Sequence, residues 1–172
     1  LALGDAFRSL GFDVVIMTQT SKLPARRPST SAKIMEQLQR RLRGLQESDT
    51  LVVGFSGHGV QFETPKRLSD GTLEAQFFCP EEANLKRPDT LVPLGKIYSM
   101  LERCPAHRKL VIVDACRNEA LSNIAKAAPE IELRPAGISQ RTVPKGMVAF
   151  FSCAEGEKSF ELKDFQHGIF CD

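Results

Sequence analysis

Leu51-Val52-Val53-Gly54-Phe55-Ser56-Gly57-His58-Gly59 is an apolar run that ends in a histidine between two glycines. A second run, Leu110-Val111-Ile112-Val113-Asp114-Ala115-Cys116-Arg117, has the same character and ends with a cysteine. Short apolar runs of this kind are typical of the buried strands of a parallel α/β sheet. Because the loops that follow neighbouring parallel strands converge on one crevice, we expect His58 and Cys116 to meet there.

The pattern around these two runs predicts alternating helices and strands in an α/β domain. Apolar residues at helical spacing predict helices over residues 3–10, 34–44 and 93–101. Strands are predicted at 14–17, 50–55, 75–79, 110–114 and 147–151. The first two strands and the helix between them predict a right-handed crossover. The polar residues that follow His58, to about residue 74, and the proline-containing residues 118–145 are predicted as loops, the second of them an exposed linker.

The composition is that of an ordinary globular protein. The chain has 172 residues and a mass of 19.0 kDa, which suits one domain with one core. Its formal net charge of +2 is too small to indicate nucleic-acid binding, and its short basic clusters are interpreted as solvated faces. No apolar run approaches the roughly 20 residues that span a bilayer. We therefore expect neither a nucleic-acid partner nor a membrane association.

The five cysteines are scattered, without a CxxC pair or the spacing of metal ligands. This usage favours a reducing compartment, so we expect a cytoplasmic protein without a bound metal. The cysteines other than Cys116 are interpreted as packing residues. The sequence starts at Leu1 without a methionine or a signal-like segment, and we expect an upstream piece to be missing from it.

A cysteine and a histidine in one crevice can act as a nucleophile and its acid–base partner. A free thiol has a reference pKa of about 8.5, so a nearby imidazole is needed to form the thiolate at neutral pH. The same imidazole can protonate the leaving amine when a peptide bond is attacked. The backbone N–H groups of Gly59 and Cys116 are candidates for stabilising the oxyanion. Either residue alone is more often structural, but the pair at matching strand ends favours a cysteine hydrolase.

Three motifs resemble those of the caspase-like peptidases, which include caspases, metacaspases and paracaspases. They are Ser56-Gly57-His58-Gly59, Asp114-Ala115-Cys116-Arg117 and the segment from Ser152 to Glu161. The 58 positions between His58 and Cys116 are close to the separation of about 50 in caspases. The resemblance covers essentially all 172 residues, and within the family the sequence most resembles bacterial caspase-like proteins. It implies a catalytic dyad of His58 and Cys116, with the amides of Gly59 and Cys116 as the oxyanion hole.

The resemblance also implies a fold and a division of the chain. The fold is a three-layer sandwich with a mostly parallel central sheet and helices on both faces. We expect the family's first strand and last helices to be absent from this sequence. Residues 1–172 then form a single, partial peptidase domain, in which 1–118 resemble a large subunit, 119–145 an inter-subunit linker and 146–172 the start of a small subunit.

Departures from the animal caspases indicate the substrate preference. Where caspases carry a glutamine two positions before the nucleophile and an aspartate-binding arginine in the third motif, this chain has Asp114 and Glu161. Carboxylates in that pocket favour a cationic substrate side chain, Arg or Lys. Metacaspases and paracaspases, which cut after basic residues, likewise carry aspartate at the position of Asp114. Glu157 is a third candidate, and a solvated surface carboxylate is an equal alternative for Glu157 and Glu161.

The resemblance implies a cysteine endopeptidase that cleaves polypeptides after Arg or Lys. Self-processing in the linker is a further hypothesis, because many relatives are cut there and the linker holds Lys126, Arg134, Arg141 and Lys145. We expect no cofactor; activation by calcium or by dimerisation, and the oligomeric state, stay open. The alternatives are a non-catalytic or dormant caspase-fold interaction module and another α/β cysteine hydrolase that acts on a small amide.

Overall fold

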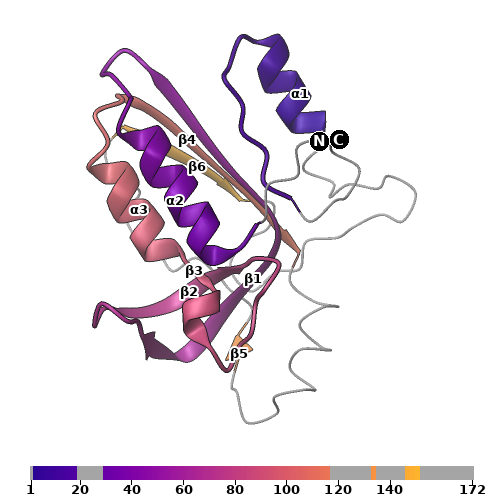
Figure 1. Cartoon of the computed structure of the whole chain (residues 1–172), viewed down its shortest axis with the longest axis vertical. Helices are drawn as coiled ribbons and strands as arrows, with labels where there is room; N and C mark the ends of the chain where they lie inside the picture. Colours follow the sequence, from indigo (N-terminus) through magenta and orange to yellow (C-terminus); the bar gives the residue numbers. More distant parts are fainter. Residues whose placement is uncertain (1, 19–28, 117–132, 135–145, 152–172) are drawn as a thin grey trace.

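The computed structural model describes residues 2–18, 29–116, 133–134 and 146–151, which form a mixed sheet with helices (Figure 1). Three α-helices and six strands are assigned in this part of the chain, together with one short 3-10 helix, η1. The helices are α1 (Ala2–Ser9), α2 (Ser31–Leu42), α3 (Leu94–Glu102) and η1 (Pro88–Thr90). The strands are β1 (Thr50–Arg67), β2 (Leu73–Cys79), β3 (Val92–Pro93), β4 (Arg108–Cys116), β5 (Leu133–Arg134) and β6 (Met147–Phe151).

The sheet has the order β3-β2-β1-β4-β6, with β5 paired to β1 outside this path. β1, β4 and β6 are parallel to one another, whereas β2 and β5 pair antiparallel with β1, and β3 pairs antiparallel with β2. The parallel part contains the two apolar runs that the sequence singled out. The predicted α/β class is therefore confirmed, as are all three predicted helices and four of the five predicted strands.

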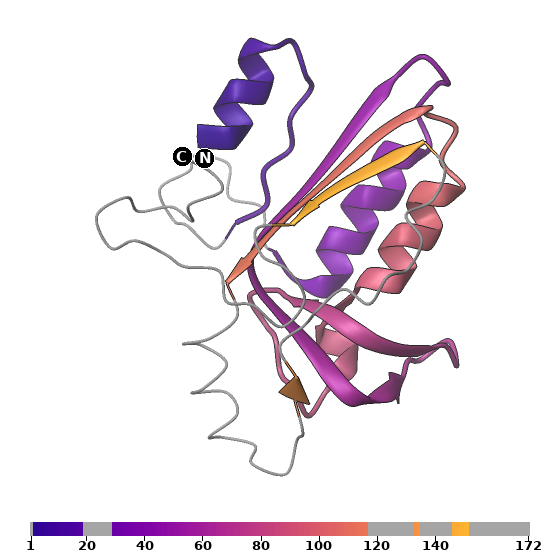
Figure 2. The same ribbon diagram turned by 180° about the vertical axis from the view of Figure 1, so that it is seen from behind.

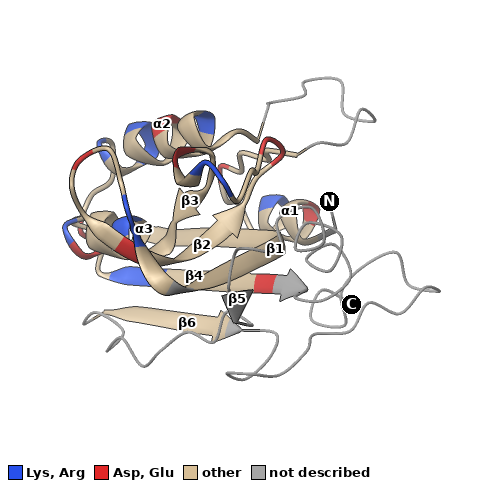
Figure 3. Ribbon diagram, turned by 90° about the horizontal axis from the view of Figure 1, so that it is seen from below, with Lys and Arg blue, Asp and Glu red and all other residues tan. Residues whose placement is uncertain are grey.

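The main core lies between the parallel strands and the helices α2 and α3, which cover the same face of the sheet (Figures 1 and 2). Apolar side chains of α2 pack there because they repeat every three or four residues along one side of the helix. The buried members of this cluster are Phe55, Val92, Ile97, Leu101, Val111, Val113 and Met147. Helices and turns carry most of the charged residues of the described chain, while the strands are mainly uncharged (Figure 3).

β1 continues well past His58, and the predicted loop after that residue is wrong. From His58 onward β1 forms an antiparallel hairpin with β2, and the register shifts once between Gln61 and Lys66. Val60 and Phe62 alternate with polar residues and are buried against Phe77 in a second apolar cluster. This period-two alternation is the signal of a half-buried strand, and it outweighs the polar composition of the stretch.

The predicted strand at 14–17 is also wrong, and with it the predicted crossover. Residues 12–18 have no regular secondary structure and form no ladder with β1. They pack against α1, since a Cβ built on Gly4 would lie 2.7 Å from the Cδ1 of Ile16. Val15 and Met17 line an open cavity beside β1. An apolar, β-branched run specifies a strand only when a partner backbone is within hydrogen-bonding reach.

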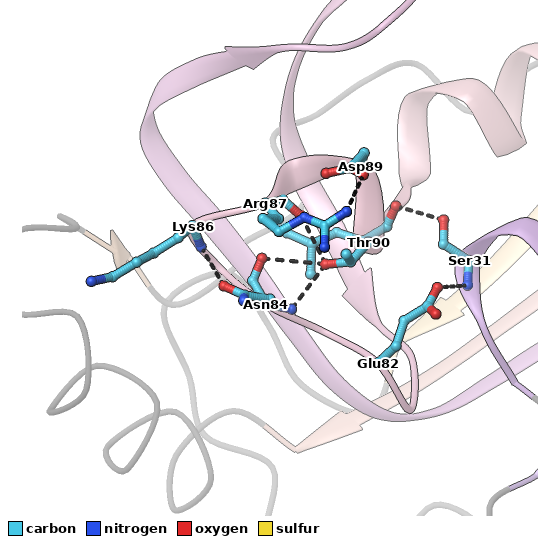
Figure 4. A network of polar contacts seen from close by, with 8 residues as sticks. Ser31, Glu82, Asn84, Lys86, Arg87, Asp89 and Thr90 are labelled. Atoms are coloured by element: carbon cyan, nitrogen blue, oxygen red, sulfur yellow. Dashed lines mark hydrogen bonds and ion pairs between the residues drawn. The ribbon is translucent and has the colours of Figure 1, made fainter.

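Polar contacts hold the loop that follows β2 against the start of α2 (Figure 4). The Ser31 N–H donates to Glu82 Oε1 at 3.0 Å, and the Ser31 hydroxyl donates to the carbonyl of Leu91 at 2.9 Å. Glu82 therefore satisfies one of the N–H groups that a helix leaves open at its first turn. The same loop begins directly after Cys79, so these contacts fix the end of β2 beside the candidate site.

A buried carboxylate joins β2 to α3. Glu74 is 7% exposed, and its Oε2 accepts from the Gly95 N–H at 2.7 Å. Its Oε1 accepts from the N–H groups of Ala75 and Gln76 at 2.9 and 3.0 Å. Three donors around one carboxylate compensate the cost of removing it from water. Glu74 thus anchors the first turn of α3 to the sheet.

Candidate active site

His58 and Cys116 are register partners in the parallel pairing of β1 with β4. The register runs without a break from the pair Thr50 and Arg108 to the pair His58 and Cys116. Neighbouring strands lie about 4.8 Å apart, so the two backbones are side by side. The side chain of Cys116 lies outside the described part of the chain, whereas that of His58 is half-buried. The structure therefore brings together the backbones of the two predicted catalytic residues.

The two glycines beside His58 differ in what they allow. Gly57 has φ of +145°, a conformation that side-chain-bearing residues rarely adopt. Gly59 is buried and pairs with Phe78 of β2. The positive φ explains why a glycine precedes His58 within a strand. The predicted oxyanion donors, the N–H groups of Gly59 and Cys116, thus belong to strands that meet at this level of the sheet.

Asp114 lies two positions before Cys116 and is 5% exposed, among the most buried charged residues of the described chain. Its register partner in β1 is Ser56, which lies two positions before His58. The four residues therefore form two register pairs on adjacent strands, with the pair Gly57 and Ala115 between them. Sequence reasoning singled out Asp114 but missed Ser56. Ser56 and Asp114 lie at the same distance, two positions, before His58 and Cys116. This equal spacing predicts that Ser56 lies beside Asp114 only if the two strands are known to be parallel and in this register.

A second cysteine also neighbours His58, on the opposite side of β1. Cys79 is the register partner of His58 in the antiparallel pairing with β2, so the histidine is flanked by two cysteines. Cys79 is buried in the second apolar cluster with Val60 and Phe77. Burial raises the pKa of the Cys79 thiol to about 12. A thiol that stays protonated at neutral pH is a poor nucleophile, which agrees with the prediction of a packing role for Cys79.

An open cavity of about 790 Å³ extends beside the first half of β1 and reaches the candidate site. Its walls come from residues 10–18, from α2 and from the whole of β1 up to His58. At the end near the site it is lined by Ser56, His58, Phe78 and Cys79. The cavity leaves His58 accessible from one side.

Some of the predicted site residues lie in parts of the chain that the structure does not describe. Glu157 and Glu161 lie outside the described part, as do Lys126, Arg141 and Lys145. Within the described part, no group of three or more His, Cys, Asp or Glu side chains is placed to hold a metal ion. Among the helices described, none has the length and apolar character that crossing a bilayer requires.

Comparisons with known proteins agree with this architecture. The chain is similar in structure to protein GSU0716 from Geobacter sulfurreducens, with a TM-score of 0.62 at 16% sequence identity. The match covers 98% of this chain and 66% of that protein, so the chain spans slightly less than two-thirds of its neighbour's length. A comparison with curated proteins finds no match. A family model described as the caspase domain matches residues 1–172. The chain therefore belongs to the caspase domain family.

Proposed function

We propose that this chain is a cysteine endopeptidase in which Cys116 is the nucleophile and His58 its acid–base partner. The observation that carries the proposal is the register of β1 with β4, in which His58 and Cys116 are partners. Membership of the caspase domain family supports cysteine peptidase activity in general. The burial of Cys79 and the raised pKa of its thiol favour Cys116 over the other cysteine beside His58.

The proposed reaction has two steps. The Cys116 thiolate attacks the carbonyl carbon of the scissile bond, and the C–N bond breaks as His58 gives a proton to the leaving amine. A thioester to Cys116 remains. Water then attacks this thioester, with His58 taking its proton, and the thiolate leaves as the carboxylate product is released. The amides of Gly59 and Cys116 would stabilise the oxyanion of both tetrahedral intermediates.

We propose that the substrate residue before the cut is Arg or Lys, and that Asp114 binds it. Asp114 is 5% exposed and lies two positions before the proposed nucleophile, where a carboxylate can form charge-assisted hydrogen bonds with a cationic substrate side chain. Ser56, the register partner of Asp114, can add a hydroxyl acceptor for a guanidinium or ammonium donor. Glu157 and Glu161 remain candidates for the same pocket.

We further propose self-processing in the segment between β4 and β6. Arg134 is the least suitable of the four basic positions, because its backbone pairs antiparallel with Gln61 in β1. A bond held in a strand ladder must be released before it can enter an active site. We therefore expect cleavage after Lys126, Arg141 or Lys145. Intact-mass spectrometry of the purified protein, beside the Cys116→Ala variant, tests this: uncleaved chains in both preparations, differing in mass only by the substitution itself, would contradict self-processing.

The proposed activity is tested with matched fluorogenic peptides that end in Arg, Lys or Asp. We expect cleavage after Arg and Lys that is lost in both Cys116→Ala and His58→Ala. Cys79→Ala is the matched control, and we expect it to keep the wild-type rate. Cleavage after Asp alone would overturn the role given to Asp114, and activity that survives in Cys116→Ala but is lost in Cys79→Ala would overturn the dyad. Folded protein that cleaves none of the peptides would favour the interaction-module alternative.

A further inference from the structure

Phe78 is the side chain that lies against the backbone immediately before His58. A Cβ built on Gly57 would lie 3.4 Å from Cε2 and 3.5 Å from Cζ of Phe78, which is van der Waals contact. The backbone of Phe78 pairs with Gly59, on the other side of the histidine. One residue of β2 therefore faces the side-chain position of Gly57 and pairs with Gly59, the two glycines that flank His58.

The ring of Phe78 is itself held in place by the main core. Its centroid lies 5.2 Å from that of Phe55, with an angle of 51° between the two rings. Phe55 is buried, and Phe78 packs against the cluster that includes Val111 and Val113 of β4. Two aromatic rings at this separation attract each other, and each phenylalanine side chain has few rotamers. The ring thus connects the backbone at Gly57 to a rigid part of the molecule.

The segment beside the ring needs such support. A histidine between two glycines has more backbone freedom than one between larger residues, because glycine populates regions of φ and ψ that other residues avoid. Gly57 occupies one of those regions, at φ of +145°. Ladder hydrogen bonds to β4 and β2 limit this freedom in the plane of the sheet, but they resist motion out of that plane less strongly. The ring of Phe78 occupies the space on one face of the sheet next to Gly57, 3.4 Å from its Cβ position.

We propose that Phe78 is a positioning residue, which acts through Gly57 to keep the His58 imidazole in place for proton transfer with Cys116. This inference rests on the proposed function, in which His58 and Cys116 form the dyad. Displacement of a catalytic group by about 1 Å can lower a rate by as much as a hundredfold. A loss of the ring should therefore act on the chemical step, while substrate binding at Asp114 changes little.

The test compares Phe78→Leu with Phe77→Leu, because the two phenylalanines are neighbours in β2 but face different clusters. Phe77 packs against Phe62, at a centroid distance of 5.6 Å, in the cluster away from Gly57. Two experiments are made on the full chain. The first follows the alkylation of Cys116 by iodoacetamide with peptide mass spectrometry and gives the pH at which alkylation is half-maximal. The second measures kcat and KM on the Arg peptide. Thermal unfolding of each variant reports its stability. His58→Ala completes the set.

For Phe78→Leu we expect the half-maximal pH of alkylation to rise toward that of His58→Ala, because a displaced imidazolium stabilises the thiolate less. We expect kcat to fall about tenfold or more, with KM within about twofold of the wild type. Phe77→Leu should lower the melting temperature without moving the alkylation midpoint.

Two results would overturn the inference. One is a folded Phe78→Leu protein whose alkylation midpoint and kcat equal those of the wild type. The other is a change of the midpoint and of kcat in Phe77→Leu that is as large as in Phe78→Leu. A midpoint that His58→Ala leaves unchanged would instead contradict the dyad, which separates the failure of the proposed function from the failure of this inference. If Phe78→Leu does not fold, Phe78→Met, which keeps volume but not the rigid ring, takes its place with the same two criteria.

Discussion

The backbone of His58 lies beside that of Cys116 at the last of nine consecutive register pairs between β1 and β4. A parallel register of this length leaves little choice about which residues of the two strands are neighbours, because a shift by one position would turn every apolar side chain to the other face. The positions of Phe55, Val111 and Val113 in the main core therefore also fix which residue lies opposite His58.

Gly57→Ala should destabilise the protein and reduce activity. At φ of +145° an alanine is strained whatever the surrounding space, and such strain costs about 1–3 kcal/mol. Gly54→Ala, in the same strand, is the matched control: no atom lies within 4 Å of the Cβ position, and we expect the free energy of unfolding to change by less than about 1 kcal/mol. Urea unfolding of the two variants measures the difference. Equal effects would show that the conformation of Gly57 is unimportant.

Asp114→Asn should remove the preference for basic peptides. The substitution keeps the shape of the side chain but removes its charge, so kcat/KM for the Arg peptide should fall about a hundredfold, which corresponds to about 2.7 kcal/mol. Ser56→Ala should reduce it by about tenfold or less, as expected for one neutral hydrogen bond. Alkylation of Cys116 in both variants serves as the control and should be unaffected. An Asp114→Asn enzyme that still prefers Arg would place the specificity in other residues.

Stability should decline in alkaline solution, in part through Cys79. Burial raises the pKa of this thiol from 9.0 to about 12, so between these values the unfolded chain releases the proton and the folded chain retains it. The contribution is complete below pH 9 and is lost as the pH rises toward 12. Tyr98, whose pKa burial also raises, acts in the same direction. Urea unfolding at several pH values should give a shallower decline for Cys79→Ala than for the wild type, and identical slopes would contradict this origin.

Glu74→Gln should lower the free energy of unfolding by about 1–3 kcal/mol. The carboxylate of Glu74 accepts N–H groups from Ala75, Gln76 and Gly95, and an amide would turn a donor toward at least one of them. Glu36→Gln is the matched control, because Glu36 forms an exposed ion pair with Lys33, which solvent and salt screen. Chemical denaturation of both variants measures the two changes. A loss no larger in Glu74→Gln than in the control would show that Glu74 does not anchor α3.

The sequence predicted the parallel part of the sheet well because its strands consist of short apolar runs. Residues 51–55 and 110–113 are apolar at nearly every position, which is typical of parallel strands, although one side of β6 is half-exposed at Val148 and Phe150. The helices were predicted for a similar reason, since Ile34, Leu38 and Leu42 lie on one side of α2 against the core.

What could not be predicted depended on partners that are distant in the sequence. Residues 14–17 include strand-forming types but pair with none of the strands that the structure describes, and Val60 and Phe62 form a strand only because β2 pairs with them. The positions of Ser56 and Cys79 beside the site follow from the register of β1 with two different strands. Register is a property of pairs of segments, so one local pattern does not reveal it.

The length of β1 has a consequence for the order in which the molecule folds. The hairpin of β1 with β2 closes through the short turn around Gly71, so it can form early. The pairing of β1 with β4 joins residues 58 positions apart and must overcome a larger loss of chain entropy. We therefore expect the hairpin to nucleate the sheet, with β4 and then β6 adding to it, so that the two halves of the candidate active site come together late in folding.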